Sequence, residues 1–464
     1  MKHDRGKTPV VTAGRLIAWS GGVSAMALAM KDKRVTGLCN DSRTIRKGEV
    51  FIAIETEKDD GHRHVANALS RGALAALVSK KKAAMFSDSQ KKRLIFTADP
   101  LAATRRIAKR YRKELRIPFI GITGSSGKTT ARKFIAAALR QALVVGETNG
   151  NWNNAIGTAM SLMRFTGEEN VGVLEMGANH AGEIHDLSTL IRPEIGVITN
   201  IGYAHVGLFG SLENTARAKC EIADGMDLKK GFLLVNGDDK LLLKHAAGLH
   251  RTIVRFGFSG PCDIRASKER TTQDGTTFEV DSAPYELSMP GRHFIYSALM
   301  AIGLGRHFGV EEKDIARALK AQRPVFLRGT VERKSGARFI VDCYNANPSS
   351  MKSALRLLQD AAGKDDAVAI VGDMLELGKY SGRLHAALGR DLAKSKVKRV
   401  LAVGDFAGTV AAGAIKAGMK AKDVVVAPNN VEALAIARKL VHPGDTVLLK
   451  GSRGVRLETV FENW

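Results

Sequence analysis

The segment 120–130, IGITGSSGKTT, carries the clearest chemistry in the chain. It has the form of an apolar strand, a glycine-rich turn and the start of a helix. Glycines let backbone N–H groups curl around phosphate oxygens, and a helix N-terminus adds partial positive charge there. Lys128 is placed to reach the β- and γ-phosphates, and the Thr129 hydroxyl to hold Mg²⁺. Ile122 replaces the first glycine of the usual motif, but the strand, turn and helix context still predicts a nucleotide-phosphate loop.

The hydrophobic pattern of the sequence predicts the strands and helices that position this loop. Apolar, β-branched runs alternate with helix-length segments, which predicts buried parallel strands in two doubly wound α/β units. The first unit has strands at 119–123, 171–175, 195–200 and 232–235, and the second at 339–343, 367–371, 400–403, 424–427 and 447–449.

The remaining N-terminal part mixes helices with short strands at 50–54 and 76–78. It ends in a very basic helix, 101–115, that is expected to be a connector, and Pro118 follows. We therefore expect an α/β protein of three domains: a small mixed domain (1–112), a central P-loop ATPase-like parallel-sheet domain (113–324) and a Rossmann-like domain (325–464).

Bulk composition is that of a globular protein, with 44% hydrophobic and 25% charged residues. Four cysteines without a C-x-x-C pair argue against a zinc ribbon or a disulfide framework and fit a reducing compartment. The apolar segment 16–30 is interrupted by serines and glycines and is too short to span a bilayer. A cytoplasmic protein without stable membrane insertion is therefore expected.

A formal net charge of +24 is the most unusual bulk property. Nucleic acid, an anionic membrane surface and polyanionic small substrates would each suit it. The charge runs 80–82, 91–93 and 105–116 are more simply solvated helix faces. Aromatic residues do not interleave with them as single-strand binders require, so no nucleic-acid partner is expected.

Several longer motifs resemble the Mur ligase family of ATP-dependent peptide ligases. The phosphate loop GITGSSGKTT is joined, in the family's order, by TNGNWNNAIG (148–157), LEMGANHAGEI (174–184), DCYNANPSSM (342–351), GDMLELG (372–378) and KGSRGVRLE (450–458). These stretches are most similar to the branch of the family that adds D-alanyl-D-alanine. Near the start, NDSRTIRKGEVFIAI (40–54) resembles the family's uridine-binding segment.

The resemblance implies a reaction. ATP would phosphorylate the terminal carboxylate of a UDP-N-acetylmuramoyl tripeptide, and the amine of D-Ala-D-Ala would attack the acyl phosphate. ATP and Mg²⁺ are the implied cofactors, and a monomer is expected. The loop residues implied to bind ATP are Gly124, Ser125, Ser126, Gly127, Lys128, Thr129 and Thr130, with Asp342 and Asn345 closing over its ribose and phosphates.

The metal and catalytic residues also come from the resemblance. Thr129, Glu175, His205 and Lys219 match positions implied to hold Mg²⁺, Lys219 as a carbamate. Lys128, Glu175, His205, Lys219 and Arg328 match the catalytic set, Arg328 being the arginine that reaches the γ-phosphate. From the residues alone, Glu175 has the alternative of a helix cap and Lys219 that of a surface charge.

Substrate contacts are implied in three places. Ser42 and Arg43 match the uridine segment. Thr148, Asn151, Asn153 and Asn154 match the loop that meets the sugar peptide, although asparagine clusters are also typical of turns. Lys450, Ser452 and Arg453 match the groups that hold the incoming dipeptide or the tripeptide carboxylates. Asn347, on the face that Asp342 and Asn345 form over ATP, is also expected to bind substrate.

One segment departs from the family pattern. Where G-x-H-N-x-x-N-A is usual on the adenine side, this chain reads GRHFIYSA (291–298), with Phe294 and Ser297 in place of two asparagines. An aromatic ring is able to stack on adenine, but two amide contacts are lost. Three alternatives therefore stay open: another Mur-type ligase, a folylpolyglutamate-type ligase, or a nucleotide-binding scaffold without catalysis. The third residue of the peptide, diaminopimelate or lysine, is not fixed by the sequence.

Overall fold

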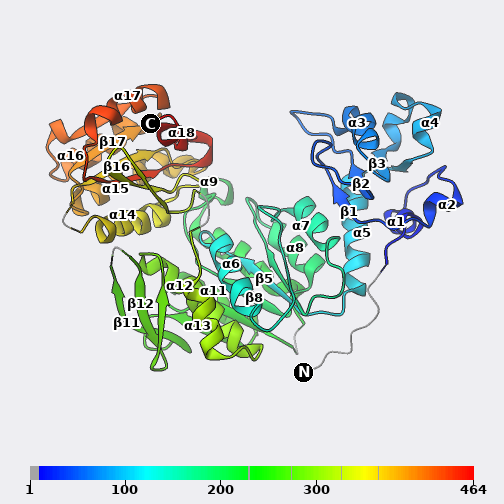
Figure 1. The fold of residues 1–464 in the computed structure, drawn as a ribbon, viewed down its shortest axis with the longest axis horizontal. Helices are drawn as coiled ribbons and strands as arrows, with labels where there is room; N and C mark the ends of the chain where they lie inside the picture. Colours follow the sequence, from blue (N-terminus) through cyan, green and yellow to red (C-terminus); the bar gives the residue numbers. More distant parts are fainter. Residues whose placement is uncertain (1–9, 228–229, 273, 325–326, 364) are drawn as a thin grey trace.

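A computed structural model describes residues 10–464 except 228–229, 273, 325–326 and 364. It contains three domains, each built on its own sheet (Figure 1). Residues 1–9 and 325–326, at the starts of the first and third predicted domains, lie outside the described residues.

The N-terminal domain has four parallel strands in the order β1-β2-β3-β4. The strands are β1 (Gly37–Cys39), β2 (Glu49–Ile52), β3 (Ala75–Ser79) and β4 (Leu94–Thr97). The helices are α1 (Ala13–Ser20), α2 (Leu28–Lys31), α3 (Val65–Ser70) and α4 (Asp88–Lys91). Both short strands predicted here are present, as β2 and β3.

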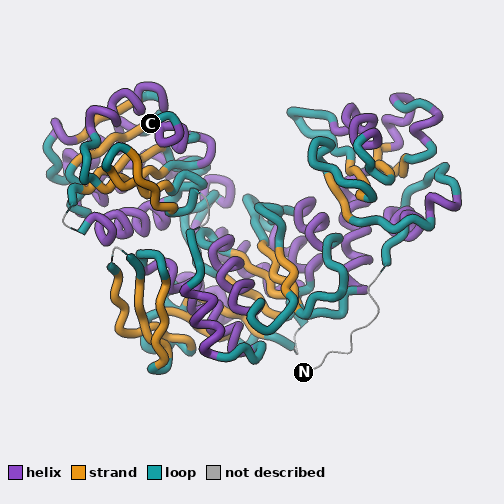
Figure 2. The backbone as a smooth tube through the Cα atoms, in the orientation of Figure 1, coloured by secondary structure: helices purple, strands orange, loops and turns teal. Residues whose placement is uncertain are grey.

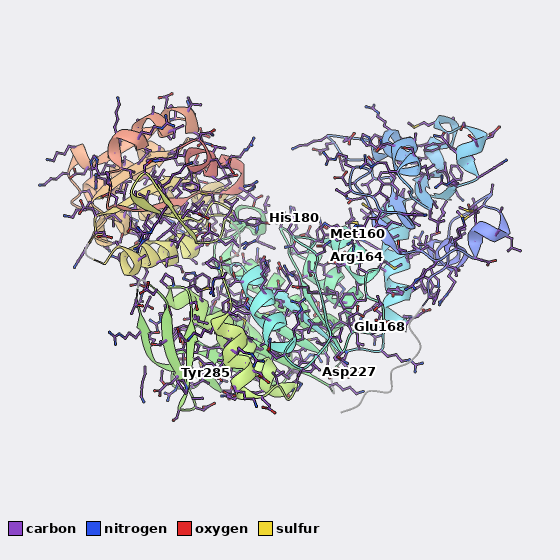
Figure 3. All side chains as sticks on the ribbon, in the orientation of Figure 1. Met160, Arg164, Glu168, His180, Asp227 and Tyr285 are labelled. Carbon is purple, nitrogen blue, oxygen red and sulfur yellow. The ribbon has the colours of Figure 1, made fainter. Side chains whose placement is uncertain are left out.

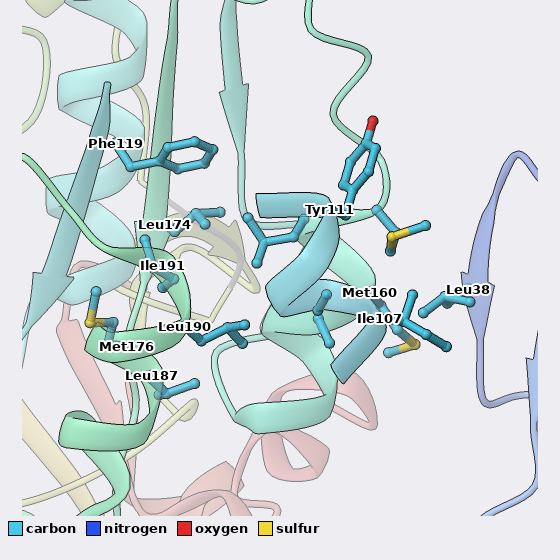
Figure 4. Packing of buried hydrophobic residues seen from close by; sticks show 14 of the residues in the cluster. Leu38, Ile107, Tyr111, Phe119, Met160, Leu174, Met176, Leu187, Leu190 and Ile191 are labelled. Atoms are coloured by element: carbon cyan, nitrogen blue, oxygen red, sulfur yellow. The ribbon is translucent and has the colours of Figure 1, made fainter. Parts of the chain in front are cut away.

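Helix α5 (Pro100–Glu114) connects this domain to the next. Asp99 caps its first turn, and Pro100 occupies a position where a missing N–H costs nothing. Its apolar face joins one hydrophobic cluster that continues from the N-terminal sheet into the central domain, and Figure 4 shows Ile107 of α5 beside Met160 and Leu38. Its basic side chains, such as Lys109 and Arg110, are exposed, as a solvated face requires.

The central domain has a nine-stranded sheet in the order β13-β12-β11-β10-β9-β8-β5-β7-β6. The strands are β5 (Phe119–Thr123), β6 (Val145–Glu147), β7 (Val171–Glu175), β8 (Ile195–Ile198), β9 (Phe232–Asn236), β10 (Ile253–Gly257), β11 (Ile264–Thr271), β12 (Thr276–Val280) and β13 (Ala283–Leu287). The helices are α6 (Lys128–Leu139), α7 (Ala155–Leu162), α8 (Glu183–Ile191), α9 (Val206–Phe209), α10 (Leu212–Cys220), α11 (Lys240–Ala246), α12 (Arg292–His307) and α13 (Glu312–Lys320). The four strands predicted here are β5, β7, β8 and β9.

The edge beyond β10 was not predicted. Strands β11, β12 and β13 pair antiparallel, and their side chains alternate between buried and exposed. Such strands are only half apolar, because one face of an antiparallel sheet meets water. Continuous apolar runs, the pattern of buried parallel strands, are therefore missing from this part of the sequence.

The C-terminal domain has a six-stranded sheet in the order β14-β15-β19-β16-β17-β18, parallel except for β14. The strands are β14 (Thr330–Lys334), β15 (Ala337–Val341), β16 (Ala367–Gly372), β17 (Arg399–Val403), β18 (Val424–Ala427) and β19 (Thr446–Lys450). The helices are α14 (Pro348–Ala362), α15 (Ser381–Lys394), α16 (Ala407–Lys416), α17 (Asn430–Leu440) and α18 (Glu458–Glu462). Helices cover the sheet on both sides (Figure 2), as predicted for a Rossmann-like unit.

The two outer domains lie at opposite ends of the molecule, and the central domain joins them (Figure 1). Arg164 of the central domain, labelled in Figure 3, forms a 3.2 Å salt bridge with Glu49 of the N-terminal domain. No helix among the described residues is both long and apolar enough to cross a membrane.

Tyr111 offers a test of how α5 joins the two domains. Its buried hydroxyl donates to the Phe165 carbonyl, so Tyr111→Phe leaves that carbonyl without its partner. We expect the free energy of unfolding to fall by about 1–3 kcal/mol, measured in urea through the fluorescence of Trp19, whose ring lies 6.5 Å from that of Tyr111. The exposed Lys109→Ala on the same helix should change it by less than about 0.5 kcal/mol. Equal stability of Tyr111→Phe and the parent would contradict this interpretation of the contact.

Candidate active site

The phosphate loop lies between β5 and α6, at the carboxyl end of the central strands. Gly124 has φ +138°, and a Cβ there would come within 2.0 Å of Thr199 Oγ1. Gly127 has φ +82° and directly precedes α6. Both glycines are therefore required by the backbone, and the N-terminus of the 12-residue helix α6 points its free N–H groups at the loop.

Thr199 and Asn200, the two residues that directly follow β8, stabilise the conformation of the phosphate loop. The sequence analysis did not single them out. Thr199 Oγ1 donates to the Ser126 carbonyl at 2.6 Å. Asn200 accepts from the Ser126 N–H at 3.0 Å and donates to the Ser126 carbonyl at 3.1 Å. Their position at the end of a strand adjacent to β5 is the sequence signal that would have found them.

Lys128 is the first residue of α6 and lies over the loop. Its Nζ donates to the Gly124 carbonyl at 2.6 Å. Burial lowers the pKa of Lys128 to about 8, helped by Arg328 and opposed by Glu175. The ammonium therefore keeps its charge at neutral pH, which is what a phosphate partner needs.

Glu175 ends β7 and is 1% exposed. Its two oxygens accept from Thr129 Oγ1 at 3.1 Å and from Arg132 Nε at 2.7 Å. Its backbone N–H donates to Thr148 Oγ1 at 2.8 Å. The carboxylate contacts side chains of α6 and does not cap a helix, so that alternative is wrong. Arg132, itself buried and also paired with Glu147, is a site residue that the sequence analysis missed.

These donors suit Mg²⁺. A hydroxyl and a carboxylate oxygen lie together beside the loop, and Mg²⁺ prefers oxygen ligands, usually one or two carboxylates with phosphates and water. Within the described parts of the chain, three or more His, Cys, Asp or Glu side chains are nowhere grouped as a protein-only metal cage. Thr129 and Glu175 would thus hold the ion together with a phosphate-bearing ligand.

Lys219 lies in α10 and is 1% exposed, so its interpretation as a surface charge is wrong. Its Nζ lies 3.4 Å from the Ala178 carbonyl and 5.0 Å from the centroid of the Phe209 ring. Burial, reinforced by the positive charge of Lys128, lowers the pKa of Lys219 to about 7. The amine is therefore neutral far more often than that of an ordinary lysine.

His205 precedes α9 and has a left-handed backbone, with φ +58°. Its Nδ1 contacts a carboxylate oxygen of Glu376, which belongs to the C-terminal domain. Burial, with Lys128 and Lys219 nearby, lowers the pKa of His205, although Glu376 acts in the opposite direction.

The C-terminal domain contributes an arginine and an ion pair. The Arg328 guanidinium lies 3.8 Å from the centroid of the Tyr344 ring. Lys450, which is 1% exposed, donates to Asp342 Oδ2 at 2.7 Å and to the Asn345 carbonyl at 2.9 Å.

One hydrogen bond connects the C-terminal domain directly to the phosphate loop. Asn347 caps α14 with its side-chain oxygen, and its Nδ2 donates to Ser126 Oγ at 2.9 Å. A residue of the third domain thus touches the loop of the second, 221 positions away in sequence.

These groups surround one cavity of about 1070 Å³ between the central and C-terminal domains. The predicted residues that line it are Ser125, Ser126, Gly127, Lys128, Thr129, Thr130, Asn153, Asn154, His205, Arg328, Asp342, Asn345, Asn347 and Lys450. Glu175 and Thr148 lie just behind it through their bonds to each other and to Thr129.

Other predicted residues lie elsewhere. Ser42 and Arg43 belong to the N-terminal domain, where Arg43 pairs with Asp41 at 2.7 Å. In the turn before α7, Asn151 is exposed, whereas Asn154, which lines the cavity, also caps the helix by accepting from Gly157 N. Ser452 accepts from Leu375 N at 2.9 Å, and Arg453 contacts Glu458. Those two lie outside the lining of the cavity.

The segment that departs from the family pattern begins α12, and its residues His293, Phe294, Tyr296 and Ser297 contribute to the lining of the cavity. Phe294 is buried and stacks on Phe134 of α6, with centroids 6.4 Å apart. The Tyr296 hydroxyl donates to Asp238 at 2.9 Å, and burial lowers the pKa of His293 to about 4. Phe294 thus has its own ring partner within the core.

Comparison with known proteins agrees with this geometry. Residues 34–112 match the model of the Mur ligase family, catalytic domain, residues 122–305 that of the Mur ligase middle domain, and residues 328–453 that of the Mur ligase, glutamate ligase domain. The UDP-N-acetylmuramoyl-tripeptide–D-alanyl-D-alanine ligase of Bacillus subtilis is 32% identical over 432 residues, 92% of this chain and 93% of that protein.

Two crystal structures are also similar. MurF from Acinetobacter baumannii has a TM-score of 0.86 and 28% identity, covering 99% of both chains. MurF from Thermotoga maritima, solved in complex with ADP, has a TM-score of 0.80 and 25% identity, covering 94% of this chain and 98% of that one. Since the matched models and relatives span nearly the whole sequence, the chain belongs to the Mur ligase family.

Proposed function

We propose that this protein ligates D-alanyl-D-alanine to a UDP-N-acetylmuramoyl tripeptide with consumption of ATP, by way of an acyl phosphate, and so makes the pentapeptide precursor of peptidoglycan. The observation that carries the proposal is a cavity in which the phosphate loop meets Arg328, Asp342 and Lys450 of another domain. Joining two substrates at the expense of a third requires such a shared site.

Each residue has a task that its position supports. Lys128 and the N–H groups at the start of α6 bind the phosphates and stabilise the charge that develops on the transferred group. Arg328 approaches the same cavity from the C-terminal side. Thr129 and Glu175 would hold Mg²⁺, which supplies electrostatic stabilisation of the phosphoryl transfer.

The proposal also assigns a role to each of the three domains and to the residues that bind the substrates. Domain 1–112 holds the uridine end through Ser42 and Arg43, domain 113–324 binds ATP, and domain 325–464 closes over it. Asn153, Asn347 and Lys450, which line the cavity, are the residues that we assign there to the peptide substrates. The protein works as a cytoplasmic monomer, and its excess positive charge suits anionic substrates without a nucleic-acid partner.

The reaction itself is tested by phosphate release. Release from ATP should require both the UDP-linked tripeptide and D-Ala-D-Ala, because the amine completes turnover. Tripeptides with diaminopimelate or lysine, assayed in parallel, identify the third residue. Release that instead depends on a folylpolyglutamate or a shorter muramoyl peptide would favour a rival ligase. No release with any acceptor would favour a scaffold without catalysis.

Lys128→Ala should lower kcat by ~10²–10³-fold, since removing one preorganised electrostatic contact at a transferring group has effects of this size. Phosphate release under saturating substrates gives the rate. Lys133→Ala, an exposed lysine on the same helix α6, is the matched control and should be near normal. A Lys128→Ala variant as fast as that control would rule out this loop as the catalytic one.

We also propose that Lys219 works as a carbamate. A neutral lysine amine attacks the carbon of CO₂ and loses a proton, giving an anionic N-carboxylate. Burial of Nζ and the nearby cation Lys128 both favour the neutral amine that this step needs. The product is a carboxylate-like ligand for Mg²⁺.

Lys219→Ala should lose most activity, and short-chain carboxylates such as acetate should restore part of it by taking the anionic position. Lys219→Arg should not be rescued, because its side chain keeps a cation there. Arg217→Ala, exposed on the same helix, serves as the control. A carbamate signal in ¹³C NMR with labelled bicarbonate should disappear in Lys219→Ala. Full activity of Lys219→Ala, or an unchanged carbamate signal, would remove the carbamate from the proposal.

A further inference from the structure

The motif GDMLELG (372–378) has no role in the function described so far, yet it contacts the site. It follows β16 in the C-terminal domain and lies against α9 of the central domain, which Figure 1 shows beside the C-terminal domain. We propose that Glu376 of this motif is a positioning residue for His205. From the neighbouring domain, it fixes the imidazole so that Nε2 is the nitrogen offered to the ligands of the cavity.

The backbones of the two segments are in close contact. The Gly207 N–H donates to the Glu376 carbonyl at 2.9 Å. A Cβ on Gly207 would come within 2.6 Å of Gly378 N, and one on Gly378 within 2.9 Å of Gly207 Cα. Both glycines are therefore needed for this approach, which places residue 376 opposite residue 205.

Side chains on either side secure the contact. Val206 is fully buried, in the same hydrophobic cluster as Met374 and Leu377 of the C-terminal domain. The Tyr380 hydroxyl donates to the Gly210 carbonyl at 2.9 Å, and its ring packs edge-on against Tyr203. His205 thus lies between Tyr203 and Val206, which both pack against the C-terminal domain, so its backbone has little freedom.

The imidazole is oriented by the remaining contact. Nδ1 of His205 meets a carboxylate oxygen of Glu376, and His205 lines the cavity. A carboxylate on one ring nitrogen fixes the proton of the neutral ring there and leaves a lone pair on the other. The structure therefore assigns Nδ1 as the protonated nitrogen and Nε2 as the nitrogen that can accept from, or coordinate, a group in the cavity.

Glu376 differs from the predicted site residues in how it acts. Among the described residues it is not part of the cavity lining, and its side chain contacts His205, which is. Since it comes from the other domain, the imidazole is oriented only while the two domains are in contact here. The expected effect of Glu376 on turnover rests on the proposed ligase function. Its effect on the orientation of the His205 ring does not depend on that function.

The orientation is tested by ¹⁵N NMR of histidine-labelled full-length protein, with His205→Ala used to assign the signal. The parent should show the Nδ1–H form of His205. In Glu376→Ala the population of that form should fall, whereas Glu376→Gln should retain it through its carbonyl oxygen. Tyr380→Phe removes one hydrogen bond of the same domain contact but leaves the bond between Gly207 and Glu376 and the contact of Glu376 with His205 in place, so it should keep the parent form.

Turnover gives the second measurement. Glu376→Ala should lower kcat by about 10- to 100-fold, the usual effect of removing a residue that orients a ligand histidine. Glu376→Gln should retain more activity, and Glu376→Ala should cost nothing further in a His205→Ala background. An unchanged tautomer in Glu376→Ala, or the same change in Tyr380→Phe, would overturn the proposal even if the ligase reaction is established. A parent protein without ligase activity would overturn the proposed function while leaving the tautomer test intact.

Discussion

A carboxylate almost removed from water, that of Glu175, constrains the arrangement of the central domain around the phosphate loop. An ionised carboxylate is costly to bury unless it is paired and hydrogen-bonded. Here Arg132 and Thr129 of α6 donate to the carboxylate, and the backbone N–H of Glu175 donates to Thr148 in the segment after β6. Displacing either element would leave a buried charge or a buried N–H without a partner. The start of α6, and with it the phosphate loop, is thereby fixed at the carboxyl end of β7.

Lysine side chains bring positive charge into the same part of the molecule. Lys219 is buried and Lys128 is partly buried, and for each of them the loss of water and a neighbouring cation lower the pKa of the amine. Lys450 has a partner in Asp342. A cavity with this balance is best satisfied by an anionic occupant, which relieves the repulsion and replaces the lost hydration. The exposed cations of α5 belong to a different setting, since they face bulk water.

The sequence predicts those parts of the protein in which one local pattern determines the outcome. Strands β5, β7 and β18 have the expected bounds because all or most of their side chains are apolar, and the loop is recognisable because its glycines are required locally. Arg132, Asn200 and Glu376 were not predicted, since their partners lie 43, 74 and 171 positions away. A local pattern does not report contacts over such separations, although for Asn200 the position just after β8 was a usable signal. The burial of Lys219 was hidden for the same reason, because it depends on the loop around Ala178.

Val206 has a consequence for how the molecule can move. By chain order it belongs to the central domain, but it packs in a hydrophobic cluster with Met374 and Leu377. Phe209 of the same helix α9 packs in the hydrophobic cluster that extends through the central domain, so α9 is buried against both domains at once. A swing of the C-terminal domain must therefore separate one of these two packings or bend the chain on either side of α9, where Gly202 and Gly210 provide backbone freedom. One short helix thus ties the two domains together at a point away from their covalent linker.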